Sequence, residues 1–153
     1  NAACRARGSA RFHLRAPLRR ELDALLEDDV AARLAARPAD VGVAVTRLSP
    51  LPKGEVILAF RDAHDVKSAL LASCCIPFYF SPAPVQFFRG APAVDGFFAS
   101  PRAAFGAPPA PNATLTVRVC PFNADTVRLE GASISPPRHT SGGQRSSSSS
   151  SSR

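Results

Sequence analysis

Apolar residues recur at steps of three and four between residues 17 and 37, which predicts an amphipathic helix over this range. Pro17 stands at its start, where proline is tolerated, and Pro38 ends it. A helix lying on a lipid surface would need a cationic polar face, and the acidic residues 27–29 argue against one. The pattern therefore favours a helix that packs on the core. The recurring apolar positions are Leu18, Leu22, Leu25, Leu26, Val30 and Leu34.

Residues 41–74 predict two strands followed by a short helix. Alternating valines favour a strand over 41–48, and the apolar run 55–60 favours a second one. The intervening Leu51-Pro52-Lys53-Gly54 is turn-like, so we expect the two strands to pair as a hairpin. Asp62 is a suitable N-cap for a helix over 63–74.

The stretch from Ser68 to Ala99 is the one around which the rest of the chain is organised. It predicts a helix end, an exit at Pro77, a strand over 85–88, a turn at Arg89-Gly90 and an apolar strand that ends in Asp95-Gly96. A glycine after the aspartate lets the backbone turn sharply and leaves the carboxylate at the strand edge, a favourable place for chemistry. The same dipeptide is common in ordinary turns, which is the interpretation favoured without further context.

The two ends of the chain differ from its middle. Residues 1–11 are Arg-rich without apolar periodicity, and we expect an irregular lead-in to a folded domain over 12–135. Within that domain, proline-rich 101–111 predicts a loop and alternating 114–120 predicts a further strand in the sheet. The Ser/Arg-rich residues 136–153 lack the apolar area needed to offset the entropy of ordering, which predicts a disordered tail.

Composition narrows the class of partner. The formal net charge is +7 and the pI is about 10.2, which raises nucleic acid or an anionic membrane surface as partners. The excess is nearly all arginine, and the shared enrichment in Arg, Ala and Pro is explained more simply by coding bias. No apolar run approaches the roughly 18 residues of a membrane span.

The cysteines and histidines indicate no metal site and no cofactor. The spacing of Cys4, Cys74, Cys75 and Cys120 is not that of a zinc site, and adjacent Cys74 and Cys75 would form a strained disulfide. Reduced thiols in a cytoplasmic protein are the simplest interpretation.

Two ordered motifs in the central stretch are similar to the second half of the patatin-like phospholipase domain. The helix exit Ala72-Ser73-Cys74-Cys75-Ile76-Pro77 resembles the family's A-S-x-x-x-P, and Val94-Asp95-Gly96 after Gly90 resembles its D-G-G or D-G-A motif. The resemblance runs from Phe12 to Asn123 and is closest to the adipose triglyceride lipase branch. It implies an α/β fold: part of a three-layer α/β/α domain without its N-terminal nucleophile-elbow portion.

The resemblance also implies a chemistry and a set of site residues. Patatin-like hydrolases cleave lipid esters with a Ser-Asp dyad, and Asp95 matches the aspartate that accepts the proton. Gly96 supports the turn and Phe97 occupies the third motif position. Phe98 and Phe105, with Phe97, become candidates to line an acyl-chain path, while filling the core is an equal alternative. The implied substrates are triacylglycerols or phospholipids, met at a lipid-droplet or membrane surface.

Two departures from the family pattern shape the functional hypothesis. Phe97 stands where the family has Gly or Ala, so it either excludes water from Asp95 or pushes the loop out of line. No G-x-S-x-G elbow or Gly-rich oxyanion loop precedes Asp95, so we expect a fragment that is inactive alone and carries the aspartate half of a lipid hydrolase. The alternative is a non-catalytic remnant that binds lipid or a lipase partner. An RNA-binding module ranks last, because basic and aromatic residues do not interleave.

Overall fold

The computed structural model describes residues 11–100, 114–115, 117–119 and 133–137. By its internal contacts the chain divides into two units, Asn1–Thr114 and Leu115–Arg153. The first unit carries all of the elements that position the candidate site. It contains both helices and a β-sheet from one continuous stretch of sequence, which confirms the α/β class that the resemblance implies.

The helix predicted over 17–37 is interrupted, and this part of the prediction is wrong. α2 spans Arg15–Leu25 and α3 spans Val30–Ala35, with Leu26 in an extended conformation between them. The acidic residues 27–29 explain the break, because negative charge is unfavourable at the carboxyl end of one helix and favourable at the amino end of the next. Arg33 in α3 then pairs with Glu27 and Asp29.

The predicted hairpins form one four-stranded antiparallel sheet with the order β2-β1-β4-β3. β1 spans Val43–Arg47, shorter than the expected 41–48, and β2 spans Lys53–Ile57, which begins two residues and ends three residues earlier than the expected 55–60. β3 spans Gln86–Phe88 and β4 spans Ala91–Asp95. β4 pairs with β1, so the strand that ends in the candidate aspartate lies in the interior of the sheet and not at its edge.

A tight turn at Arg89-Gly90 joins β3 to β4, as the sequence predicts. Both residues have positive φ, 48° and 77°, which is the backbone of the two-residue turn that best matches the twist of a hairpin. Glycine adopts this conformation freely, whereas arginine does so at a cost. The side chain of Arg89 compensates through the ion pair described below.

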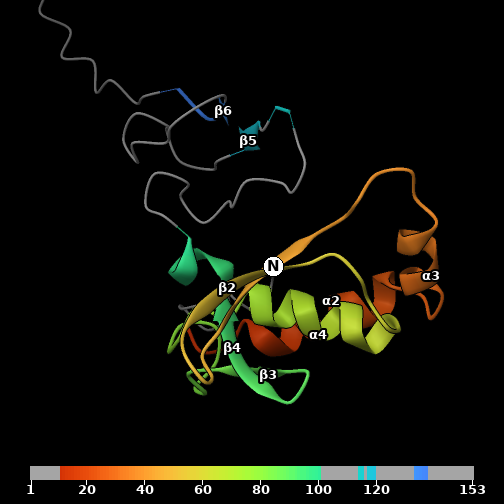
Figure 1. The fold of residues 1–153 in the computed structure, drawn as a ribbon. Helices are drawn as coiled ribbons and strands as arrows, with labels where there is room; N and C mark the ends of the chain where they lie inside the picture. Colours follow the sequence, from red (N-terminus) through yellow and green to blue (C-terminus); the bar gives the residue numbers. More distant parts are fainter. Residues whose placement is uncertain (1–10, 101–113, 116, 120–132, 138–153) are drawn as a thin grey trace, which may run out of the picture. The chain divides into compact units, whose positions relative to one another are not determined.

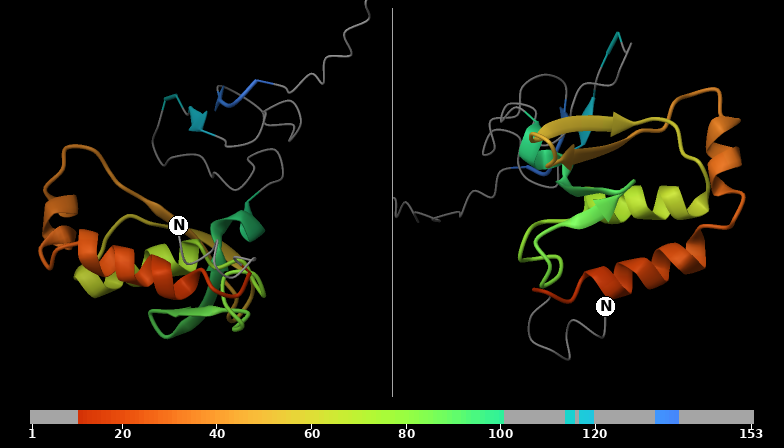
Figure 2. Two further views of the ribbon diagram at one scale, coloured as in Figure 1. Left: turned by 180° about the vertical axis from the view of Figure 1, so that it is seen from behind. Right: turned by 60° about the horizontal axis from the view of Figure 1, so that its bottom comes forward.

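α4, which spans Ala63–Ser73, covers one face of the sheet. The views of Figure 1 and Figure 2 show α4 between the sheet and α2, so the helices stack outward from one side of the sheet. The sequence favours a first helix that packs on the core. In the structure α2 packs mainly on α4 and not directly on the sheet. Between α4 and the sheet lies a core of small and branched residues: Val45, Ile57, Ala69, Ala72, Phe88 and Ala93.

A second apolar cluster joins α4 to α2. It consists of Leu71, Cys75 and Phe80, and three leucines at helical spacing pack against it from α2 and the residue before it. These leucines are Leu14, Leu18 and Leu22. The apolar residues whose spacing predicted a packing helix therefore form the face of α2 that contacts α4. The cluster fixes the loop that leaves α4, which in turn contacts the end of β4.

The second unit contains a short parallel pair of strands. β5 spans Arg118–Val119 and β6 spans Ser133–Ile134. We expected residues 114–120 to add a strand to the main sheet, and this is wrong for the described residues: the strand is shorter and belongs to a separate sheet. Alternation indicates a strand but does not choose its partner. The loop predicted over 101–111 and the tail beyond residue 137 lie outside the described residues.

Candidate functional site

Asp95 is the last residue of β4, and its backbone is held from two sides. Its N–H donates to the carbonyl oxygen of Cys75, 3.0 Å away, just beyond the carboxyl end of α4. Its carbonyl oxygen accepts a 2.8 Å hydrogen bond from the hydroxyl of Thr46 in β1. Thr46 is only 1% exposed, so the bond gives both its buried hydroxyl and the backbone carbonyl of Asp95 a partner. The two bonds fix the backbone of Asp95, from which its carboxylate projects.

The carboxylate of Asp95 is half-buried and caps the short 3₁₀ helix η1, Gly96–Ala99. Its Oδ1 accepts a 2.9 Å hydrogen bond from the backbone N–H of Phe97. Burial raises the pKa of the Asp95 carboxyl above its ordinary value, and the Phe97 N–H acts in the opposite direction. Within the described part of the chain no cation forms an ion pair with Asp95. A carboxyl whose pKa is raised is a better proton acceptor than an ordinary one.

Gly96 is the residue that allows this turn. A side-chain carbon at Gly96 would lie 2.7 Å from Cβ of Ala44 and 2.9 Å from that residue's backbone, closer than any such pair tolerates. The expectation that Gly96 supports the turn after the aspartate therefore has a concrete cause in this structure: η1 lies directly against β1. Glycine is needed at this position because a side chain would clash with Ala44, and not because of the backbone conformation, since the φ of Gly96 is not positive.

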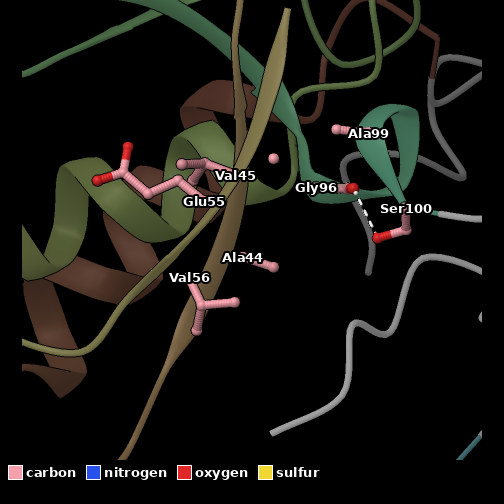
Figure 3. Close-up of a pocket in the computed structure, with 8 residues that line it drawn as sticks. Ala44, Val45, Glu55, Val56, Gly96, Ala99 and Ser100 are labelled. Atoms are coloured by element: carbon pink, nitrogen blue, oxygen red, sulfur yellow. Dashed lines mark hydrogen bonds between the residues drawn. The ribbon is translucent and has the colours of Figure 1, made fainter. Parts of the chain in front are cut away.

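A pocket of about 190 Å³ lies between η1 and the hairpin β1–β2 (Figure 3). Its walls include Ala44, Gly54, Gly96 and Ala99, and Ser100 closes one side by donating to the carbonyl oxygen of Gly96 at 3.1 Å. Asp95 pairs with Val45, so its side chain lies on the sheet face that α4 covers, whereas Ala44 projects to the other face. The pocket therefore adjoins the turn after Asp95 and not its carboxylate.

The aromatic residues that were candidates for an acyl path are exposed. The rings of Phe97 and Phe98 meet edge to face, 5.9 Å apart, and the two residues are 47% and 51% exposed. The alternative that they fill the core is therefore wrong for both. A role along an acyl path stays a prediction. Phe105 lies outside the described residues.

Two thiols lie beside Asp95 but are poor nucleophiles. Cys74 and Cys75 are free, the first exposed and the second buried. Burial raises the pKa of both thiols, and the charge of Asp95 raises them further. Among the residues that the structure describes, no cluster of His, Cys, Asp or Glu could hold a metal ion. Asp95 is therefore the group at this site suited to acid-base chemistry.

Sequence reasoning did not find the groups that hold Asp95. Thr46 is a single polar residue among valines, and its bond to Asp95 crosses 49 positions of sequence. The Cys75 carbonyl is a backbone group that carries no sequence signal at all. Polar residues inside an otherwise apolar strand are a weak hint that a hydrogen-bond partner exists, but the hint does not name the partner.

Three comparisons bear on the identity of the chain. A family model described as patatin-like phospholipase matches residues 5–107, a range that includes both the helix exit 72–77 and Asp95-Gly96. No curated protein and no solved structure matches the chain. In the described part of the chain no helix is both long and apolar enough to span a membrane.

Proposed function

The chain belongs to the patatin-like phospholipase family, and from this premise we propose that it is the aspartate-bearing part of a lipid acyl ester hydrolase. The observation that carries the proposal is the position of Asp95. It lies inside the matched range, at the end of an interior strand, and its carboxyl is half-buried with a raised pKa. The family implies a lipid ester as substrate.

In the proposed reaction a serine attacks the ester carbonyl, and Asp95 accepts the serine proton. The carbonyl carbon becomes tetrahedral, and backbone amides stabilise the oxyanion that forms. The tetrahedral carbon then expels the alcohol, which takes the proton from Asp95. Water, whose proton Asp95 accepts, attacks the acyl-enzyme, and the serine leaves with that proton as the fatty acid is released. Asp95 supplies the base, and the bonds to Cys75 and Thr46 keep it aimed. The printed sequence contains no G-x-S-x-G elbow, so the serine would come from sequence before Asn1.

Finer features of the function follow the resemblance. We propose a substrate of the triacylglycerol or phospholipid type, action at a lipid-droplet or membrane surface, a cytoplasmic setting, and a place near the adipose triglyceride lipase branch. Phe97 and Phe98, exposed beside Asp95, support contact with acyl chains. Nucleic acid is not a proposed partner.

The second candidate is a non-catalytic member of the family that binds lipid or a lipase partner. Phe97 favours it, because a large residue stands where the family has a small one. The N–H of Phe97 nevertheless donates to the Asp95 carboxylate, and Phe97 is about half exposed with its ring against that of Phe98, so the substitution is compatible with either function.

The test begins with the transcript upstream of the codon for Asn1. A Gly-rich loop and an in-frame G-x-S-x-G would support the hydrolase, and a start codon without them would favour the non-catalytic alternative. If the elbow is found, the extended protein should hydrolyse lipid esters, and Asp95→Asn should lower kcat by about a thousandfold because the base is lost.

Asp40→Asn is the matched control, since Asp40 is exposed and distant in sequence from the site. It should leave kcat unchanged. Residues 1–153 alone should show no turnover. If they hydrolyse lipid esters and Asp95→Asn abolishes that activity, no upstream serine is needed and the proposal is contradicted.

A further inference from the structure

Four exposed apolar residues lie on two hydrogen-bonded segments, one just before α2 and one just after the carboxyl end of α4. The aromatic patch consists of Phe12, Ile76, Phe78 and Tyr79, which are 37–57% exposed. Hydrogen bonds join its two segments: the N–H of Phe12 donates to the carbonyl oxygen of Tyr79 at 2.7 Å, and Nε of Arg11 donates to that of Phe78 at 3.3 Å. Apolar side chains gathered in this way on a surface usually mark a contact site.

Backbone strain holds two of these rings outward. Phe12 and Phe78 have φ values of 68° and 57°, in the left-handed region that bulky residues rarely adopt. The neighbouring residues are anchored, because Phe80 is buried and its carbonyl oxygen accepts from the N–H groups of Leu14 and Arg15. Strain that a well-packed surrounding maintains is typical of functional positions.

Arginines follow the first segment of the patch in the sequence, from Arg11 into the first turns of α2. Residues 11–20 contain four arginines and no acidic residue, and all four are exposed. They are Arg11, Arg15, Arg19 and Arg20. The guanidinium of Arg11 lies 4.7 Å from the ring centre of Phe12, which places a positive charge at the patch itself. The acids that argued against a lipid-surface helix, residues 27–29, follow the far end of α2. Two acids, Glu21 and Asp23, lie within α2, and Asp23 pairs with Arg19 and with Lys67 of α4.

We propose that the aromatic patch inserts into an anionic phospholipid surface, with the arginines of residues 11–20 on the lipid head groups. Exposed aromatic rings flanked by arginine suit the boundary between head groups and acyl chains. The patch and the candidate site are linked through the chain, because Ile76 follows Cys75, whose carbonyl oxygen accepts a hydrogen bond from the backbone N–H of Asp95. Binding would thus bring Asp95 to the surface that holds the substrate.

This inference deepens the proposed function and rests on it for its purpose, but it is tested without turnover. Tyr79 is the single tyrosine of the chain, which has no tryptophan, so intrinsic fluorescence reports on the patch without a label. The chain is mixed with vesicles of phosphatidylcholine alone or with about one third phosphatidylserine. We expect cosedimentation with the anionic vesicles, and loss of Tyr79 emission when brominated acyl chains are present.

Phe78→Gly is the decisive variant. Glycine adopts positive φ freely, so the variant relieves strain and should fold at least as well as the parent, while vesicle binding should weaken about tenfold because one ring is lost. Phe87→Ala is the control, since Phe87 is 65% exposed on β3 and outside the patch. Arg15→Gln with Arg20→Gln should weaken binding to anionic vesicles and leave binding to neutral ones unchanged.

Three results would overturn the inference. The first is a folded chain that does not bind anionic vesicles, and the second is equal weakening by Phe78→Gly and Phe87→Ala. The third is a dimer that Phe78→Gly dissociates, which would assign the patch to a second copy of the chain. None of these bears on whether an upstream serine exists, so failure here and failure of the proposed hydrolase are separable.

Discussion

A carboxylate lies at each end of α4, and the two differ in their hydrogen-bond and ion-pair partners. At the amino end Asp65 forms a two-pronged ion pair with Arg89, with Nε to Oδ1 at 3.0 Å and Nη2 to Oδ2 at 2.6 Å. The backbone N–H of Arg61 adds a third bond. At the carboxyl end Asp95 receives one bond from an N–H and, among the described residues, no ion pair.

Their pKa values diverge for the same reasons. The hydrogen bond from Arg89 lowers the pKa of Asp65, whereas burial raises that of Asp95. The helix dipole favours an anion at the amino end of α4 and disfavours one at the carboxyl end. Asp65 is therefore held as an anion at neutral pH, and it ties α4 to the turn between β3 and β4. Asp95 is a group that can exchange a proton, and this difference separates a structural carboxylate from a chemical one.

The largest expected effect on stability comes from removing the ion pair between Arg89 and Asp65 at the amino end of α4. Arg89→Met keeps the length of the side chain and leaves the Asp65 carboxylate buried without its partner, which should lower the free energy of unfolding by about 3 kcal/mol. The positive φ remains in the variant, so the change leaves the turn and removes the side-chain contacts of Arg89: the ion pair, the hydrogen bond to the carbonyl oxygen of Ala59 and the contact with the ring of Phe88. Urea unfolding followed by circular dichroism measures it.

Arg61→Met is the control for this experiment. Arg61 is exposed and contacts Asp65 through its backbone N–H, which the substitution retains. It should change the free energy of unfolding little. If the two variants lose equal stability, the pair between Arg89 and Asp65 is not what holds this end of α4.

At the other carboxylate, Asp95, we expect Gly96→Ala to have an intermediate effect on stability. The added methyl group meets Ala44 at 2.7 Å, and relieving the clash must move η1 or β1, at a cost of about 2 kcal/mol. Gly90→Ala is the contrasting control, because it has open space around it and only its positive φ to oppose the change. In Gly96→Ala the carboxyl carbon signal of Asp95 should shift in an NMR spectrum. An unchanged signal would show that η1 does not position Asp95.

Much of the fold could be predicted from periodicity and turn chemistry. The hairpin turn at Arg89-Gly90, the Asp62 N-cap and the helix after it are found as the local pattern indicates, because each depends on neighbours in sequence. The break between α2 and α3 was missed, since the apolar steps continue across residues 26–29 while the charges do not permit a helix there. The pairing of residues 118–119 was missed because register depends on distant partners.

The site was predictable only in part. Asp95-Gly96 stood out as a motif. Thr46 and the Cys75 carbonyl bond the backbone of Asp95, and Arg89 bonds the carboxylate of Asp65, each across 20 or more positions, where pattern gives no signal. Asp65 reads in sequence as an ordinary acid in a first helical turn. Only its contact with Arg89 makes it different from Asp95.

The smallest effect, and the sharpest test of the comparison, is the pH dependence of stability. The folded state holds the proton of Asp95 more tightly than the unfolded chain does, since the pKa is raised from 3.8. This stabilising contribution is full below pH 3.8 and is lost as the pH rises through the folded pKa. For Asp65 the pKa is lowered from 3.8, so its contribution is present above that pH and is lost as the pH falls through the folded pKa.

Asp95→Asn should therefore gain stability relative to the parent as the pH rises from 3 to 7, because asparagine keeps the acceptor for Phe97 N–H and never ionises. Asp65→Asn should lose stability relative to the parent over the same rise, because it gives up a charge that Arg89 binds only in the folded state. Urea unfolding of the three proteins at matched pH values measures both differences. Slopes of the same sign would mean that the two carboxylates are alike, and that Asp95 is not the tuned base that the proposed chemistry needs.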